Sequence, residues 1–224
     1  VKKTACIALE NYCDVRIAEI MGRFLEDDDS ELVLLVLRWL ARHDEIRCDV
    51  QPLVDLSRNS SNPLVRAGAI TALGGRVEEY LFVEFLKDEE WFVRVAAVDV
   101  LGKPGSNVVD ELLAALEDGS WRVRQSAALV LGNLREKRAV PALCRCLQDP
   151  SAKAASLISL IEIGDSDFVS GFVSMIEENP RILFGVSLKL FYRVFSSFDE
   201  RTLGELQRLI DSESYVVHRY AVEA

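Results

Sequence analysis

The clearest feature of the hydrophobic pattern is a block of helix-like sequence that recurs along the chain. The stretches WFVRVAAVDVLG at 91–102 and WRVRQSAALVLG at 121–132 place apolar and polar residues in the same order. With the Val of the Val-Arg pair as anchor, related copies are anchored at Val1, Leu32, Val65, Val93, Val123, Ala152, Ile182 and Val216. The anchors lie 28 to 34 residues apart, enough for two helices of about three turns and two short connections. The pattern therefore predicts a series of helical hairpins.

Two columns of this register predict the buried side chains of the second helix in each hairpin. Eight residues after the anchor, the last copy has Ala224 and the other seven of the eight copies have a leucine: Leu9, Leu40, Leu73, Leu101, Leu131, Leu160 and Leu190. Four residues after the anchor the side chains are mostly small: Ala5, Val36, Ala69, Ala97, Ala127, Ser156 and Val186. Both offsets lie on the helical face of the anchor itself. We expect this face to form the core, with small residues where neighbouring helices approach closely.

Three further columns predict where the second helices begin and end. Two residues before the anchor stand Ser30, Pro63, Trp91, Trp121, Pro150, Pro180 and Ser214, and proline is favoured at the first position of a helix. One residue earlier, most side chains can accept a hydrogen bond from the first turn: Asp29, Asn62, Glu90, Ser120, Asp149, Asn179 and Glu213. Nine residues after the anchor, Gly74, Gly102 and Gly132 are predicted to end the helix in a left-handed conformation.

These residues resemble HEAT repeats, and in particular the short subtype of phycobilisome lyase-like proteins. The pattern VRxxAxxxLG runs from Val65 to Gly74, from Val93 to Gly102 and from Val123 to Gly132, and residues 138–149 are similar to the first helix of that subtype. The resemblance covers the whole chain but weakens toward both ends. It implies an all-α fold, a right-handed α-α superhelix (an armadillo-type solenoid) of about seven helical hairpins, with the Val-Arg helices on the concave side.

The same register bears on how the chain is divided. Residues 1–224 form one array in which the columns show no domain boundary. The first residue falls on a repeat anchor, and the last, Ala224, lies eight residues into the final copy. Because solenoid ends normally carry polar capping repeats, we expect this array to be a fragment of a longer one.

Composition narrows the possible partners. The 224 residues carry a formal net charge of −10, and half of them are hydrophobic. This charge disfavours nucleic acid and anionic lipid, so neither nucleic acid nor a membrane is expected as a partner. The five cysteines contain no CxxC pair and favour a reducing, cytoplasmic location in which they act as small buried hydrophobic residues.

A basic column is the most prominent candidate for binding. Lys2, Arg66, Arg94, Arg124 and Lys153 directly follow the anchor in five of the eight copies and could hold nucleic acid or a phosphorylated peptide. However, acids stand five residues before several anchors, at Asp27, Asp88, Asp118, Glu177 and Asp211. We favour the interpretation that these acids pair with the arginines of their own or a neighbouring repeat.

Catalytic chemistry finds little support in the sequence. A DNA glycosylase built from related repeats needs a cationic cleft, and a di-iron centre needs repeated His-Glu pairs, whereas this chain is acidic and has only His43 and His218. Sequences typical of a nucleophile or a phosphate loop are also missing. No cofactor or metal is therefore expected. Bilin-lyase-like activity stays open as an alternative because the repeat subtype itself suggests it.

Aromatic residues gather toward the end of the chain. Nine of the 18 lie in the last quarter: Phe168, Phe172, Phe184, Phe191, Tyr192, Phe195, Phe198, Tyr215 and Tyr220. They could form a docking patch for a partner, but a bulkier core in a divergent part of the array is the interpretation that we favour.

The sequence as a whole predicts a non-enzymatic scaffold that binds another protein along the concave face. Shape and distributed polar contacts would supply the affinity. The candidate contact residues are Arg66, Arg94, Arg124 and Lys153, with Trp91 and Trp121 near the rim. Self-association through the ends of the array stays open.

Overall fold

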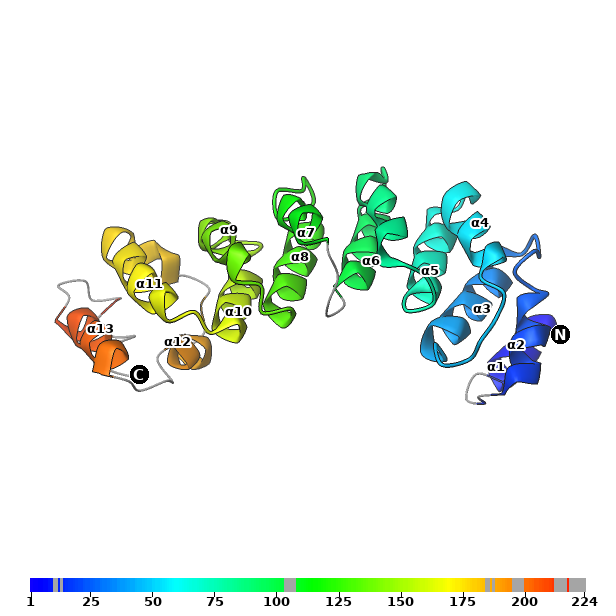
Figure 1. Cartoon of the computed structure of the whole chain (residues 1–224), viewed down its shortest axis with the longest axis horizontal. Helices are drawn as coiled ribbons and strands as arrows, with labels where there is room; N and C mark the ends of the chain where they lie inside the picture. Colours follow the sequence, from blue (N-terminus) through cyan, green and yellow to red (C-terminus); the bar gives the residue numbers. More distant parts are fainter. Residues whose placement is uncertain are drawn as a thin grey trace. The chain divides into compact units, whose positions relative to one another are not determined.

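The computed structural model describes residues 1–9, 12, 14–102, 108–183, 186, 188–194, 200–211 and 217. Within these residues the chain forms helices and turns and no strand (Figure 1), as the repeat pattern predicts. It divides into two compact units, Val1–Glu111 and Leu112–Ala224. Unit 1 contains α1 (Lys2–Ala8), α2 (Val15–Gly22), α3 (Ser30–Arg42), α4 (Gln51–Asn59), α5 (Pro63–Leu73), the 3₁₀ helix η1 (Glu79–Lys87) and α6 (Trp91–Leu101).

The division falls within α7 (Val109–Ala115). Unit 2 then contains α8 (Trp121–Asn133), η2 (Lys137–Ala139), α9 (Val140–Cys146), α10 (Lys153–Ile163), α11 (Ser166–Glu178), η3 (Pro180–Leu183), α12 (Leu188–Val194) and α13 (Glu200–Ile210). No helix within the described ranges is long and apolar enough to cross a membrane.

Each unit is built from helical hairpins whose second helices pack on one another. In unit 1, α5 contacts both α3 and α6, while α4 packs on α5 and η1 on α6. In unit 2, α8 packs on α10, and α9 covers α10. Two of the first helices, α7 and α9, are shorter than the sequence predicts, with 7 residues each, whereas α11 has 13. The 3₁₀ helix η1 has only 9 residues. Because a 3₁₀ helix rises about 2.0 Å per residue, η1 is about 18 Å long, close to the length of the three-turn α-helix that the sequence predicts.

The two core columns are confirmed in the central repeats. The leucines at 40, 73, 101, 131 and 160 are at most 2% exposed, and the small residues from Val36 to Val186 are at most 4% exposed. The first copy departs from the pattern, because Ala5 is exposed and Leu9 is half-buried.

The predicted helix starts are confirmed at Ser30, Pro63, Trp91 and Trp121, but the capping residues are only partly those expected. Asp29 and Asn62 accept hydrogen bonds from the first turns of α3 and α5. Glu90 and Ser120 make no such side-chain bond. Their own N–H groups instead donate to the carboxylates of acids two residues earlier, Asp88 at 2.9 Å and Asp118 at 2.7 Å. Each aspartate thus forms an Asx turn, which fixes the backbone just before the helix begins.

Later repeats begin differently. Asp149 accepts from the N–H and the hydroxyl of Ser151, and α10 starts at Lys153 rather than at Pro150. Pro180 begins the short 3₁₀ helix η3. The prediction of a second-helix start at Pro150 is therefore wrong, because the local Asx turn holds the chain out of the helix for one more turn.

The predicted role of the glycine column is confirmed only in part. Gly74 and Gly102 do end α5 and α6, but their φ angles of −54° and −76° are not left-handed, and Gly132 lies inside α8. Among the residues that the structure describes, the left-handed glycines are Gly75 and Gly164. Close packing explains the column better: a Cβ on Gly132 would lie 2.6 Å from the Cα of Ser159. Glycine is needed there because the backbone of α10 leaves no room for a side chain.

Part of the predicted aromatic cluster belongs to the core. Phe168, Phe172 and Phe191 are buried, and the rings of the first two stack with centroids 5.5 Å apart. For these three residues the interpretation as a bulky core is confirmed. The anchor Val216, the side chain of Tyr192, and the residues Phe184, Phe195, Phe198, Tyr215, His218 and Tyr220 lie outside the described part of the chain.

Candidate partner-binding site

The arginines of the basic column hold the turn that precedes their own helix. In three successive repeats the Nη1 atom donates to the carbonyl oxygen six residues earlier. The distances are 3.0, 2.7 and 2.8 Å in the pairs Arg66–Ser60, Arg94–Asp88 and Arg124–Asp118. Because these carbonyls lie outside the helices, the guanidinium satisfies acceptors that the backbone cannot. The column therefore closes the turn between the two helices of each hairpin.

Arg66 also reaches the next repeat through a two-pronged ion pair. Its Nε and Nη2 atoms donate to the two carboxylate oxygens of Asp88 at 3.0 and 2.9 Å. Both side chains are less than a fifth exposed. Burial by itself raises the pKa of Asp88, but the hydrogen bonds from Arg66 and from the Glu90 N–H bring it below its usual value. The interpretation of the column as an intramolecular ladder is confirmed for Arg66.

Arg124 is paired as well, although not with the acid expected from the register. Its Nε and Nη2 atoms donate to Asp149 at 2.9 and 2.6 Å, and Nη2 also reaches the hydroxyl of Ser151 at 3.1 Å. Leu147 occupies the acid position of the following repeat. The carboxylate is therefore supplied from two residues further along, and Asp118 contributes its backbone carbonyl instead.

Lys153 and Lys2, at the two ends of the basic column, differ in exposure. Lys153 is only 8% exposed, and burial lowers its pKa. Lys2 is exposed and donates to Asp27 at 2.6 Å, again linking one repeat to the next. A buried lysine cannot present its charge to a partner, so Lys153 contributes to packing rather than to the exposed surface.

The two tryptophans at the helix starts remain partly open to solvent, with Trp91 37% and Trp121 41% exposed. Trp91 makes an edge contact with Phe92, and the guanidinium of Arg122 lies 4.3 Å from the ring of Trp121. In unit 1, Leu64 at the start of α5 is also 54% exposed. The starts of α5, α6 and α8, which we call the rim, thus carry large apolar side chains that are partly exposed.

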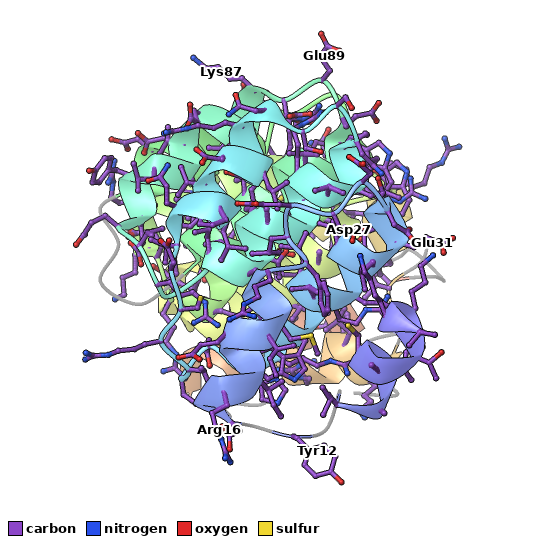
Figure 2. The ribbon with its side chains drawn as sticks, turned by 90° about the vertical axis from the view of Figure 1, so that its right-hand side faces the viewer. Tyr12, Arg16, Asp27, Glu31, Lys87 and Glu89 are labelled. Carbon is purple, nitrogen blue, oxygen red and sulfur yellow. The ribbon has the colours of Figure 1, made fainter. Side chains whose placement is uncertain are left out.

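Acidic side chains accompany this rim in unit 1. Glu31 and Glu89 project from the surface, as Figure 2 shows; Glu31 lies in the first turn of α3, and Glu89 lies in the turn before α6. Their charges favour the helix starts electrostatically. Glu31 is also paired with Lys3.

The exposed face of the second helices in unit 1 has few charges. It consists of the residues two, three and six positions after each anchor, which are half-buried or exposed: Leu34, Leu35 and Arg38 of α3, Ala67, Gly68 and Thr71 of α5, and Val95, Ala96 and Asp99 of α6. We call these residues the second-helix face. The repeat register could have located this face, because it follows from the same offsets that predict the core.

Arg76 is a structural residue that our interpretation of the sequence missed. It follows α5 and donates to the carbonyl of Ala72 at 2.8 Å, within that helix. The same guanidinium reaches four carbonyls at and after the end of α3, at distances of 2.7 to 2.9 Å: Leu40, His43, Asp44 and Ile46. One side chain therefore closes the C-terminal ends of two neighbouring second helices. The register places one other arginine here, Arg193, whose guanidinium binds Glu162, so no column indicated this role.

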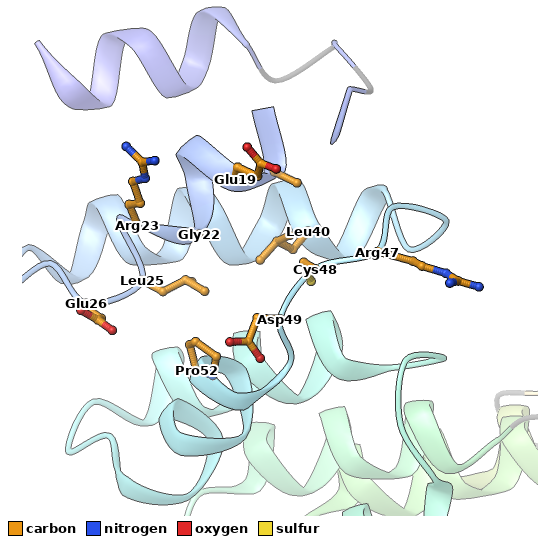
Figure 3. Close-up of a pocket in the computed structure, with 11 residues that line it drawn as sticks. Glu19, Gly22, Arg23, Leu25, Glu26, Leu40, Arg47, Cys48, Asp49 and Pro52 are labelled. Atoms are coloured by element: carbon orange, nitrogen blue, oxygen red, sulfur yellow. The ribbon is translucent and has the colours of Figure 1, made fainter. Parts of the chain in front are cut away.

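A cleft of about 690 Å³ lies on the first-helix side of unit 1 (Figure 3). Residues of α2 and of the segment leading into α4 line it, over the buried side chain of Leu40. A second depression of about 480 Å³ shares four of its residues, Leu25, Glu26, Asp49 and Pro52. We call the two together the α2–α4 cleft.

Among the residues considered for metal or redox chemistry, the structure describes His43 and four of the five cysteines. His43 ends α3, stacks on Trp39 with ring centroids 4.6 Å apart, and places Nδ1 2.8 Å from the Trp39 carbonyl. Cys6 is buried, whereas Cys48, Cys144 and Cys146 are half-buried. Across the described residues, no three His, Cys, Asp or Glu side chains are grouped as metal ligands would be.

Comparison with known proteins is consistent with this architecture. The family of HEAT repeats matches three overlapping stretches, residues 50–114, 79–164 and 109–184, which together span more than half of the chain. Phycocyanobilin lyase subunit alpha of Nostoc sp. (strain PCC 7120) is 30% identical over 116 residues. That match covers 46% of this chain and 42% of the lyase subunit, so the chain spans less than half the length of this curated relative.

Among solved structures, an engineered protein superposes on this chain with a TM-score of 0.55 and 16% sequence identity. The superposition covers 92% of this chain and 67% of the engineered protein. At this level of identity the likeness concerns the fold, and it agrees with stacked helical hairpins.

Proposed function

Because the chain belongs to the HEAT repeat family, we propose that it is a non-catalytic scaffold that binds another protein through the second-helix face. One observation carries the proposal. The second-helix face of unit 1 presents half-buried Ala67, Gly68 and Ala96, whereas Arg66 is engaged inside the protein. A surface of this kind favours binding by shape and by contacts spread over several repeats.

The geometry also indicates what the basic column contributes. Arg66 and Arg124 hold turns and neighbouring repeats, so reversing their charge would perturb the fold as well as any interface. The exposed Trp91 and Trp121 are better placed to contact a partner, because aromatic side chains supply much of the energy of interfaces.

Substitution of the exposed Thr71 tests this proposal. Thr71→Arg adds a long charged side chain to the middle of the second-helix face, and Ala114→Arg adds the same side chain to an exposed position of the first helix α7. Affinity capture from a native lysate, followed by quantitative mass spectrometry, should show partners retained by wild type and by Ala114→Arg and lost with Thr71→Arg. Equal recovery with both variants, at equal thermal stability, contradicts binding through this face.

A second candidate function rests on the match to phycocyanobilin lyase subunit alpha. Under this alternative the chain acts as part of a bilin lyase. Mixing the purified protein with free bilin and an acceptor protein should then produce a covalent adduct that absorbs visible light. If no adduct forms while an active lyase in parallel produces one, this alternative is removed.

A further inference from the structure

The α2–α4 cleft has the dimensions of a binding site and lies apart from the second-helix face. Its larger part encloses about 690 Å³, within the range of about 300–1,000 Å³ that is usual for ligand sites. The floor is apolar, since Ala18, Leu25 and Leu40 are at most 4% exposed. An apolar side chain that enters the cleft would therefore exchange water for hydrocarbon contacts.

Carboxylates dominate the walls. Glu19, Glu26 and Asp49 line the larger part, and Asp55 joins the last two in the smaller part, which has no lining lysine or arginine. Two arginines, Arg23 and Arg47, also line the larger part, and Arg47 extends away from Leu25 and Leu40 (Figure 3). The excess of acidic over basic lining residues is therefore greatest in the smaller part, where a cationic side chain is favoured.

We propose that the α2–α4 cleft binds an extended segment of a partner protein in which basic and apolar side chains alternate. The apolar side chains fit the floor around Leu25 and Leu40, and the basic ones lie beside Glu26 and Asp49. Because the two depressions share a wall, the occupant spans both, which suits a peptide segment better than a compact molecule. Binding here is independent of the second-helix face.

Gly22 provides a way to block the cleft without disturbing the fold. It is the last residue of α2 and lines the larger part of the cleft, and a Cβ built on it meets nothing within 4 Å. Gly22→Leu therefore adds a bulky side chain to the lining of the larger part without a clash at its Cβ. Gly171→Leu is the matched control, because Gly171 lies in α11 and its Cβ also meets nothing within 4 Å.

Binding is measured with a fluorescein-labelled synthetic peptide of alternating lysine and leucine, by fluorescence anisotropy at low and high salt. An alternating glutamate and leucine peptide is the control for charge. Cys48 lines the cleft and is half-buried, so the lysine peptide should also slow its alkylation by iodoacetamide, followed by mass spectrometry. Wild type and Gly171→Leu should bind the lysine peptide and protect Cys48, and the glutamate peptide should do neither.

Two variants then separate shape from charge. Gly22→Leu should weaken binding of the lysine peptide at least about tenfold and remove the protection of Cys48, because the added side chain takes up space in the larger part. The double variant Glu26→Gln/Asp49→Asn should weaken it about threefold to thirtyfold at low salt. In wild type the Gln51 N–H donates to the Asp49 carboxylate at 3.0 Å. The amide oxygen introduced by Asp49→Asn can still accept this hydrogen bond. Failure of wild type to bind, unchanged binding by Gly22→Leu, or unprotected Cys48 overturns the proposal.

Discussion

Removing the guanidinium of Arg76 tests whether one side chain holds the ends of two neighbouring helices. Arg76→Met keeps the length of the aliphatic stem but deletes donors to five carbonyls, of Ala72 and of the four acceptors at and after the end of α3. It also removes a positive charge from the C-terminal end of α3, where a cation is favourable.

The magnitude follows from the contacts. Hydrogen bonds that involve a charged group contribute about 1.5–3 kcal/mol each, but these share one donor group, and water can reach some of the freed carbonyls. We therefore expect Arg76→Met to lower the free energy of unfolding by about 2–4 kcal/mol. Arg76→Lys should lose less, because an ammonium group still donates to some of these acceptors.

The assay combines urea unfolding, followed by circular dichroism, with amide hydrogen exchange. In Arg76→Met the amides of residues 40–46 should exchange faster than in wild type, while those of α10, in the other unit, should not change. A variant that unfolds at the wild-type urea concentration with unchanged exchange at 40–46 would refute the argument that Arg76 stabilises the end of α3.

Two further predictions concern packing and pH. Gly132→Ala places a Cβ 2.6 Å from the Cα of Ser159 and should cost about 1–3 kcal/mol, whereas Gly171→Ala, with open space around its Cβ, should stabilise by about 0.5–1 kcal/mol. Equal melting temperatures for the two variants would contradict this. The folded pKa of Asp88 is lowered by Arg66 in spite of burial, so this stabilisation is present above the ordinary carboxyl pKa of about 3.9 and is lost as the pH falls through the folded pKa. Asp88→Asn should have a smaller loss of stability than wild type on acidification, and an unchanged pH slope of the urea midpoint would count against it.

The arrangement of hairpins could be predicted because the repeat brings the same physical requirement back in every copy. Leu73, Leu101 and Leu131 all fill one position between stacked helices, and a column of identical residues reveals such a position without any structure. Proline at the start of α5 and asparagine before it are similarly local signals, since they act within one turn.

The candidate site was less predictable, because its contacts join residues that are close only after folding. The acids near the basic column suggested pairing, and Asp88 does pair with Arg66. The register pointed to Asp118 for Arg124, and the carboxylate that binds Arg124 belongs to Asp149. Arg76 binds backbone carbonyls at the end of α3. Because every residue type carries a carbonyl, no column of similar side chains could indicate this contact.

For this protein, the sequence alone determined the all-helical repeat, the buried faces of the second helices and the acidic charge, because periodicity and composition act along the chain. Tertiary structure decided which acid meets which arginine, why Gly132 must lack a side chain, and where a cleft opens between α2 and α4. These features depend on distances of a few ångströms between different helices. Such distances are set by how the hairpins stack, and no single repeat carries them in its own sequence.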